Sequence, residues 1–171
     1  APSQAGSIKR FCDQANCQGI ARRLSTPPVG LRLAGRLPSG NWPLLAASAL
    51  PYGEQNQLPA AITRAEMDTL REQFVASTRR TAEAGFDWLE LHCAHGYLLS
   101  AFISPLTNLR EDEYGGSLEN RCRYPLEVFR AIRAVWPEDK PISVRLSCHD
   151  WFEGGNTPED AAIFARMFKE A

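Results

Sequence analysis

The chain has 171 residues, of which 44% are hydrophobic and 23% are charged, and its formal net charge is −1. This length is sufficient for one domain with a buried core. Because the lysines and arginines are scattered rather than clustered, no nucleic-acid partner and no membrane-surface partner are expected. The sequence also lacks an uninterrupted apolar stretch of about 18 residues, so no membrane span is predicted.

The N-terminal segment has no apolar stretch of the kind found in secretory signals, and it begins without methionine. We therefore expect either a processed chain or a piece of a longer polypeptide. The five cysteines are odd in number, widely spread and free of any CxxC pair. This distribution argues against a disulfide framework and a structural zinc site, and it favours a reducing, cytoplasmic location.

The beginning of the chain carries only weak structural signals. Residues 7–18 show a faint helical stripe, and residues 29–34 have the composition of a short strand. Residues 36–62 contain many of the prolines and glycines without a clear period. We expect a long loop there, with room for a short hairpin, and loops of this length are often functional.

A well-marked helix is predicted to begin after Thr63. The sequence TRAE forms a capping box, in which Thr63 caps the helix and Glu66 reaches back to it. Residues at helical spacing then form an apolar stripe, and Gly85 is placed to end the helix. The stripe consists of Met67, Leu70, Phe74 and Thr78. Residues 86–92 follow directly as a strand.

Two further helices flank a second strand at residues 141–147. Ser117 is expected to cap the first of them, which contains Pro125, and Thr157 caps the second, with Pro158 at its first position. Their apolar faces are formed by Leu118, Cys122, Leu126, Phe129 and Ile132, and by Ala161, Phe164 and Phe168. This alternation of helices and strands predicts an α/β fold with a parallel sheet and right-handed crossovers.

Each of the two strands has one apolar face and one polar face, because successive side chains point to opposite sides of a strand. Strands of a doubly wound sheet are covered by helices on both faces and are apolar on both. The pattern therefore favours part of a (β/α)8 barrel, with the polar faces lining the interior near its mouth. These polar faces carry Trp88, Glu90 and His92 in the first strand, and Ser143, Arg145 and Ser147 in the second.

The arginine on the second strand needs an explanation. Burying the charge of Arg145 is costly unless a negative group meets it, and Glu90 on the neighbouring strand could be that group. Alternatively, Arg145 faces a ligand that carries or develops negative charge. Both interpretations hold if Glu90 orients the guanidinium.

Two of the three histidines, His92 and His95, lie where the first strand ends, and this end carries the active site in barrels. Three interpretations compete. A metal site would lack a carboxylate ligand at suitable spacing, so no metal is predicted. The pair could be two hydrogen-bonded structural histidines. It could also be a pair of donors that bind a carbonyl or phenolate oxygen, with Tyr97 nearby as a proton source.

The run HCAHGYLLSAFISPLTNLREDEYGGSLENRCRYPLEVFRAI, followed by PISVRLS, resembles the old yellow enzyme family of FMN-dependent ene-reductases. It is most similar to the bacterial branch that includes NADPH dehydrogenases and 2,4-dienoyl-CoA reductases. It also resembles the reductase half of fused salicylyl-CoA 5-hydroxylase-type proteins. The resemblance extends from about Gly35 to the C-terminus, and the pattern SPLTN…DEYGGSLENR is highly specific.

The resemblance implies a barrel that binds FMN, with NADPH or NADH as the reductant and a small-molecule substrate. In this family the flavin passes hydride to an activated C=C, in an α,β-unsaturated carbonyl or an aromatic or enoyl-CoA. The family motif H-x-x-[H/N]-x-Y matches His92, His95 and Tyr97. By resemblance, His92 and His95 bind the substrate carbonyl oxygen, Tyr97 protonates or orients at the α-carbon, and Arg145 binds the flavin beside its N1–C2 edge.

The match to the family is incomplete. A complete barrel needs roughly 250 residues, so we expect three to four central β/α units in residues 36–171, preceded by an atypical segment in residues 1–35. Gly30 and Leu33 stand where the family has a flavin-binding glutamine and a histidine. The alternative function is a catalytically incompetent fragment that acts at most as a binding or interaction module. A homo-oligomer and a larger polypeptide are both left open.

Three polar residues follow the histidine motif. Arg121, within EYGGSLENR, is expected to hold the preceding loop to Glu119 or Asp112. Arg110 and Asn108 lie in the excursion after the histidines, and their approach to substrate is left open.

Overall fold

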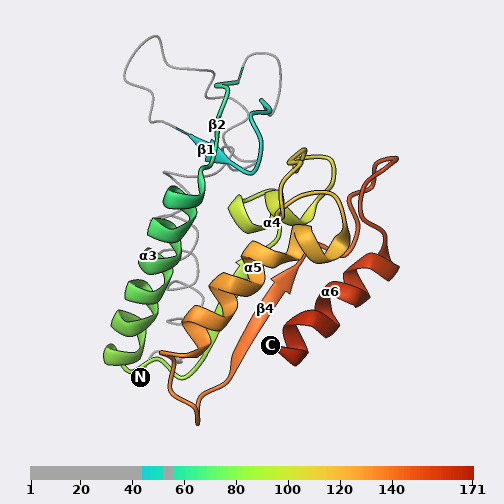
Figure 1. Ribbon diagram of the computed structural model, residues 1–171. Helices are drawn as coiled ribbons and strands as arrows, with labels where there is room; N and C mark the ends of the chain where they lie inside the picture. Colours follow the sequence, from blue (N-terminus) through green and yellow to red (C-terminus); the bar gives the residue numbers. More distant parts are fainter. Residues whose placement is uncertain (1–43, 52–55) are drawn as a thin grey trace.

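A computed structural model describes residues 44–51 and 56–171 of the chain (Figure 1). The sequence-based expectations for residues 7–18, residues 29–34, Gly30 and Leu33 lie outside these residues. In chain order the described elements are β1 (Leu45–Ala46), β2 (Ala60–Ala61), α3 (Arg64–Glu83), β3 (Leu89–Cys93), α4 (Leu98–Ile103), α5 (Leu118–Arg133), β4 (Ile142–Leu146) and α6 (Pro158–Glu170).

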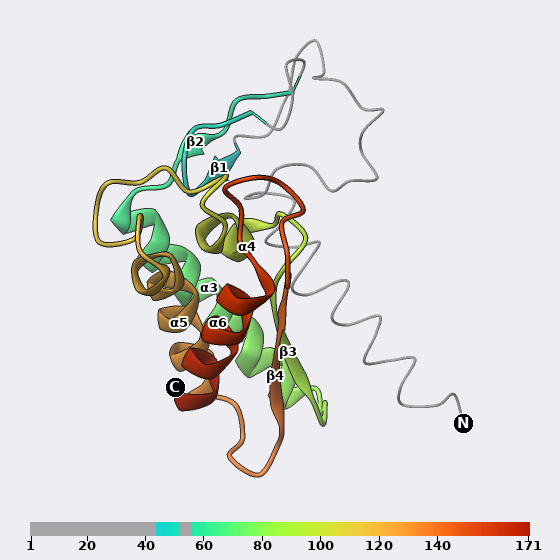
Figure 2. The ribbon, with the colours of Figure 1, turned by 90° about the vertical axis from the view of Figure 1, so that its right-hand side faces the viewer.

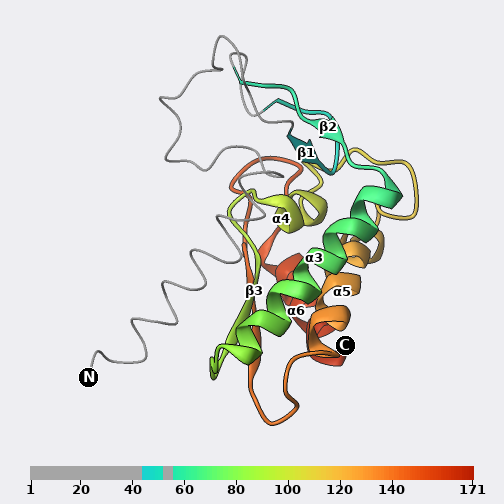
Figure 3. The same cartoon turned by 90° about the vertical axis from the view of Figure 1, so that its left-hand side faces the viewer.

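The central feature is a parallel pair of strands with helices packed on one side. β3 and β4 pair in register from Leu89 opposite Ile142 to Cys93 opposite Leu146, as the alternation of elements predicts. Figure 2 shows α3, α5 and α6 together on one side of this pair, and the opposite view in Figure 3 shows α3 and α5 running side by side. Within the described residues this sheet has two strands and does not close. The architecture is therefore α/β and consistent with part of a barrel.

β1 and β2 form a second, very short pair, and the expectation of a hairpin in this region is wrong. Leu45 pairs with Ala60 and Ala46 with Ala61, and the two strands run parallel, whereas a hairpin requires antiparallel strands. Backbone hydrogen bonds from Ala60 N to Leu44 O (2.8 Å) and from Ile62 N to Ala46 O (2.9 Å) extend the pairing.

The helix ends follow the predicted capping chemistry. Thr63 and Glu66 form both halves of the capping box of α3, and Gly85 follows its end with a left-handed φ of 81°. Thr157 caps α6, which has Pro158 at its start, and Ser117 accepts a hydrogen bond from the backbone of Asn120 at the start of α5. All three helices therefore begin at the residues that the sequence indicates.

The core lies between the β3–β4 sheet and its helices. Leu89, Leu91 and Cys93 are buried there, and Ile142, Val144 and Leu146 pack against the same core from β4. The predicted apolar strand faces are thus confirmed. The helices contribute the predicted stripe residues Met67, Leu70, Phe74, Cys122, Leu126, Phe129, Ile132, Ala161, Phe164 and Phe168, all of which are buried.

The short helix α4 is missed by the sequence analysis, which expects an excursion here. All six of its residues, from Leu98 to Ile103, are buried. A segment that is apolar on every side has no helical period to detect, so its pattern could not reveal the helix. α4 lies beyond the carboxyl ends of β3 and β4, which places it next to the candidate site (Figure 2).

Candidate active site

The candidate site is built on the face of the β3–β4 pair that the helices leave uncovered. Glu90 and His92 alternate with the buried residues of β3, and they stand opposite Ser143 and Arg145 of β4. At the amino end of the sheet, the indole nitrogen of Trp88 donates to the hydroxyl of Ser143 over 3.0 Å. The two strands therefore present their polar side chains on one face, as the alternation predicts.

A tight turn at the carboxyl end of β3 gathers His92, His95 and Tyr97. His95 and Gly96 both have left-handed backbones, with φ values of 62° and 73°. The ring of His92 lies 4.9 Å from that of His95 and 5.3 Å from that of Tyr97, measured between centroids, with edge-to-face geometry in both pairs. The structure thus brings together the three residues of the motif.

Hydrogen bonds fix this turn. The backbone N–H of His95 donates to the hydroxyl of Ser147 over 3.1 Å, which connects the ends of β3 and β4. The N–H of Gly96 donates to Ser100 within α4. A left-handed conformation at a residue other than glycine costs about 1 kcal/mol. These contacts hold His95 in that conformation, so its ring is held beside that of His92.

The electrostatic surroundings keep His92 neutral. Burial, as the largest cause, and the nearby charges of His95 and Arg145 together lower its pKa to about 4. A neutral imidazole retains one N–H donor at physiological pH. Its buried Nδ1 has no hydrogen-bond partner among the described residues. His92 therefore has a ring nitrogen that is not used within the described residues and that could form a hydrogen bond with a bound molecule.

Arg145 pairs with Glu90 and also remains accessible. Its Nε lies 2.8 Å from Glu90 Oε1, and 53% of its side chain is exposed, against 25% for Glu90. In the strand register Arg145 stands opposite His92, so its side chain leans back diagonally toward Glu90. The predicted ion pair is present, and the guanidinium still faces the open side of the sheet.

The donors on this face fit the electron-rich edge of a flavin and the oxygen of a substrate. Arg145 supplies a permanent cation, and His92 supplies a partly buried ring with an unpartnered nitrogen. The acid among them, Glu90, is already engaged by Arg145. FMN therefore suits these residues chemically. The described residues contain no group of three or more histidine, cysteine or acidic side chains arranged to hold a metal ion.

A buried polar network supports the loops around the site, and the sequence predicts only part of it. The sequence predicts that Arg121 bonds to Glu119 or Asp112, and this prediction is wrong. Its Nε donates to Ile103 O (2.8 Å), its Nη1 to Gly116 O (2.7 Å) and its Nη2 to Asn156 Oδ1 (2.9 Å). The expected partners were wrong because Arg121 points inward from α5, toward loops that are distant in sequence.

The same network fixes the loop that follows β4. Asp150 Oδ2 accepts hydrogen bonds from the hydroxyl of Ser104 (2.7 Å) and the backbone N–H of Asn156 (2.8 Å). Sequence reasoning missed Ser104, Asp150 and Asn156. The sequence shows only that a polar, glycine-containing loop follows a strand. It cannot show that the side chains of this loop bond with Ser104 at the end of α4 and Arg121 in α5.

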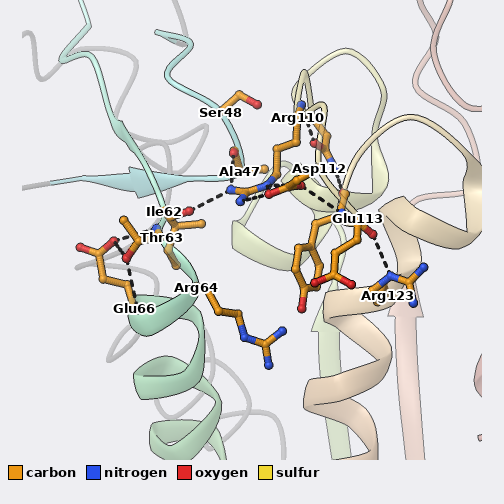
Figure 4. A network of polar contacts seen from close by, with 12 residues as sticks. Ala47, Ser48, Ile62, Thr63, Arg64, Glu66, Arg110, Asp112, Glu113 and Arg123 are labelled. Atoms are coloured by element: carbon orange, nitrogen blue, oxygen red, sulfur yellow. Dashed lines mark hydrogen bonds and ion pairs between the residues drawn. The ribbon is translucent and has the colours of Figure 1, made fainter.

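Arg110 and Asn108 have structural roles in the loop after α4, and Figure 4 shows the contacts of Arg110. Arg110 Nη1 donates to Ile62 O (2.8 Å) and Ala47 O (3.3 Å), while its Nε donates to Asp112 (2.9 Å). Asn108 Nδ2 donates to two backbone carbonyls, each at 2.7 Å. The polar atoms of both residues are thus used to hold the loop and the β1–β2 pair in place.

Comparison with known proteins identifies a single family. Residues 43–171 match the NADH:flavin oxidoreductase / NADH oxidase family. An NADPH dehydrogenase of Geobacillus sp. (strain WCH70) is 42% identical over 144 residues, which cover 83% of this chain and 42% of that protein. An NADH oxidase of Thermoanaerobacter brockii is 44% identical over 127 residues, covering 74% of this chain and 20% of that protein.

Solved structures give a matching fold. A 2-naphthoyl-CoA reductase in complex with 2-naphthoyl-CoA superposes with a TM-score of 0.70 at 31% identity, covering 74% of this chain and 19% of that chain. An old yellow enzyme from Pichia sp. AKU4542 superposes with a TM-score of 0.65 at 34% identity, covering 75% and 36%. The chain spans about two fifths of the length of curated NADPH dehydrogenases that it matches. The family resemblance drawn from residues 92–132 and 141–147 is confirmed, as are FMN and a nicotinamide reductant at the level of the family.

Proposed function

We propose, because this chain belongs to the NADH:flavin oxidoreductase / NADH oxidase family, that it forms the substrate-activating part of an FMN-dependent ene-reductase. The reaction would move hydride from NADPH or NADH to the activated C=C of an α,β-unsaturated carbonyl compound. One observation carries the proposal. The rings of His92, His95 and Tyr97 are grouped at the carboxyl end of β3, and Arg145 stands opposite His92 on β4.

FMN, when bound, would accept hydride from the nicotinamide and deliver it to the β-carbon of the substrate. Arg145 would hold the N1–C2 edge of the flavin, where negative charge gathers on reduction. Its guanidinium suits this role because it remains charged at any working pH and is half exposed toward the open face of the sheet. This assignment makes Arg145 the cofactor-binding residue of the described chain.

His92 and His95 would bind the carbonyl oxygen of the substrate. Hydride addition at the β-carbon moves negative charge onto that oxygen, and N–H donors already in place stabilise it without reorganisation. A pKa of about 4 keeps His92 a neutral hydrogen-bond donor rather than a general acid. The proton that completes the reduction would therefore come from another group.

Tyr97 is the group proposed to supply that proton. It occupies the N-cap position of α4, with its ring 5.3 Å from that of His92. The phenol would transfer its proton to the α-carbon as hydride reaches the β-carbon, and solvent would then restore it. The added hydride and proton together saturate the C=C bond, so the reaction balances.

The proposed substrate class depends on this chemistry and on one protein of similar structure. A conjugated ketone, aldehyde or thioester provides both an electrophilic β-carbon and an oxygen for the histidines. Because one structural neighbour is a 2-naphthoyl-CoA reductase in complex with 2-naphthoyl-CoA, we include aromatic and enoyl-CoA thioesters among the proposed substrates.

A second candidate is a binding or interaction module without turnover. The open sheet favours it: the described β3–β4 pair has two strands, and 47% of Trp88 is exposed. In this case the chain would retain three to four barrel units in residues 36–171 after an atypical segment in residues 1–35, and its exposed strand face would mediate binding or self-association.

The proposal also includes a reducing, cytoplasmic setting. Cys93, Cys122 and Cys148 are free thiols, and burial raises the pKa of Cys122 to about 12 and that of Cys93 well above its usual range. Such buried thiols are protonated and inert. Among the described residues, no helix combines the length and apolar character that a bilayer crossing requires. Whether copies of the chain associate is tested by its sedimentation.

The test is a titration of the purified 171-residue protein with FMN, followed through the visible flavin spectrum. If FMN binds, a phenol is titrated next, because a phenolate mimics the charged oxygen of the reacting substrate. We expect His92→Ala to weaken phenol binding without unfolding the protein. Failure of both this chain and the longest polypeptide of its coding region to bind FMN would leave the second candidate.

A further inference from the structure

Glu90 lies at the centre of the open sheet face, and its carboxylate engages only one part of Arg145. The ion pair joins Glu90 Oε1 to Arg145 Nε at 2.8 Å. Within the described residues, neither terminal nitrogen of the guanidinium donates a hydrogen bond to another side chain or carbonyl. The ion pair therefore fixes the inner end of the planar group and leaves its outer end available.

The register explains why this contact sets a direction. Glu90 pairs with Ser143 in the sheet, and Arg145 stands two residues further along β4, opposite His92. The ion pair is therefore diagonal and pulls the inner end of the guanidinium back toward the amino end of the strands.

Stability alone is a weak reason for this pair. Ion pairs between side chains with substantial solvent contact contribute little to folding, and 53% of the Arg145 side chain is exposed. A long, exposed arginine otherwise moves among many rotamers, and a ligand must then fix it at an entropic cost. A carboxylate already paired with Nε removes part of that cost before the ligand arrives.

From this geometry we infer that Glu90 is a positioning residue for the flavin site, which orients Arg145 and moderates its positive charge. The inference rests on the proposed function, since it assigns Arg145 to the flavin. Its two parts are separable. Orientation requires an acceptor at Oε1, whereas moderation of charge requires the negative charge itself.

Two substitutions separate these parts. Glu90→Gln keeps an acceptor of the same shape and removes the charge. Glu90→Leu removes both. Glu170→Gln, in an exposed position near the end of α6, is the matched control for loss of a carboxylate. Each protein is first compared with wild type by its circular dichroism and unfolding midpoint.

The first measurement needs no cofactor. The ¹⁵Nε–H resonance of Arg145 is recorded in the 171-residue protein, and its assignment is verified with Arg145→Lys. We expect Glu90→Leu to shift this resonance toward that of a free arginine, Glu90→Gln to shift it less, and Glu170→Gln to leave it unchanged. An identical resonance in wild type and Glu90→Leu overturns the orienting role, whether or not FMN binds.

The second measurement uses FMN in the longest polypeptide of the coding region. Glu90→Leu should weaken FMN binding about tenfold, the size of one lost oriented charged contact. Glu90→Gln should bind FMN nearly as wild type does but have a more positive flavin reduction potential, because the uncompensated cation stabilises the anionic reduced flavin. An unchanged potential in Glu90→Gln overturns the charge part. Absence of FMN binding by wild type contradicts the proposed function instead, and the resonance still decides the orienting role.

Discussion

Arg121 Nη2 donates to Asn156 Oδ1 over 2.9 Å, and both side chains are buried. This bond joins α5 to the loop after β4, and through Ile103 O the same arginine reaches the end of α4. No acidic side chain lies within ion-pair distance of Arg121 among the described residues, so neutral acceptors satisfy its charge. Burial accordingly lowers the pKa of this guanidinium.

The network predicts a large stability loss in Arg121→Met. The substitution leaves the buried acceptors Ile103 O and Asn156 Oδ1 without this donor, and each unpaired buried group costs about 1–3 kcal/mol. We expect the free energy of unfolding to fall by about 2–4 kcal/mol, measured by urea denaturation. The control is Arg123→Met, two residues along the same helix, where the arginine is exposed and bonds to Glu113 O and Asn120. An equal loss in both variants would contradict a special role for Arg121.

Two adjacent glycines should respond differently to alanine. A Cβ on Gly115 would meet the carbonyl oxygen of Arg110 and lie 2.7 Å from its Cβ, whereas a Cβ on Gly116 would meet nothing within 4 Å. Gly116→Ala should lose only about 1 kcal/mol of stability, because the alanine must adopt a left-handed φ of 81°. We expect Gly115→Ala to lose roughly 2–3 kcal/mol because the backbone of the loop must move. Thermal and urea unfolding of both variants measure the difference, and a smaller loss in Gly115→Ala would refute the packing argument.

His92 predicts a dependence of stability on pH. Its pKa is about 4 in the folded protein and about 6.5 when unfolded, so between these values the unfolded chain binds a proton that the folded chain excludes. Stability should therefore fall as the pH drops from 7 to 5, by about 1 kcal/mol after allowance for solvent screening. Urea unfolding of wild type and His92→Asn at both pH values isolates this contribution. A pH slope that is the same in both proteins would show that His92 does not cause it.

Arg110 is predicted to hold the β1–β2 pair onto the rest of the fold. Its Nη1 donates to the carbonyls of Ile62 and Ala47 (Figure 4). Arg110→Met should lower the free energy of unfolding by about 1–2 kcal/mol and speed hydrogen exchange at the N–H groups of Ala60 and Ile62. Exchange in β3 should stay unchanged. Arg64→Met, whose arginine pairs with Asp68 at the surface, is the control and should leave that exchange as in wild type.

Local chemistry made much of the fold predictable. Helix starts at Thr63, Ser117 and Thr157 depend on a side chain and the backbone a few residues away, so the sequence contains the whole interaction. The alternation in β3 and β4 likewise predicted which side chains face the helices. The spacing of His92, His95 and Tyr97 then placed these three rings at one strand end.

The incorrect predictions have two physical origins, which are contacts between residues distant in sequence and segments without a detectable period. Arg121 was assigned nearby acids, but its acceptors include Ile103 O and Asn156, 18 and 35 residues away. The parallel pairing of β1 and β2 was missed because two-residue strands have no detectable alternation. α4 was missed for a related reason, since complete burial removes the contrast between polar and apolar faces.

The pairing of His92 with Arg145 in the sheet has a consequence for how this sequence can diverge. Side chains in a strand alternate with a period of two, so deleting one residue between Ile142 and Arg145 would turn the arginine into the helix-packed core and bring an apolar side chain out in its place. Replacing side chains in these strands alters the site by degrees, whereas changing their length by one dismantles it. Among natural variants, gain or loss of residues should therefore be confined to the loops.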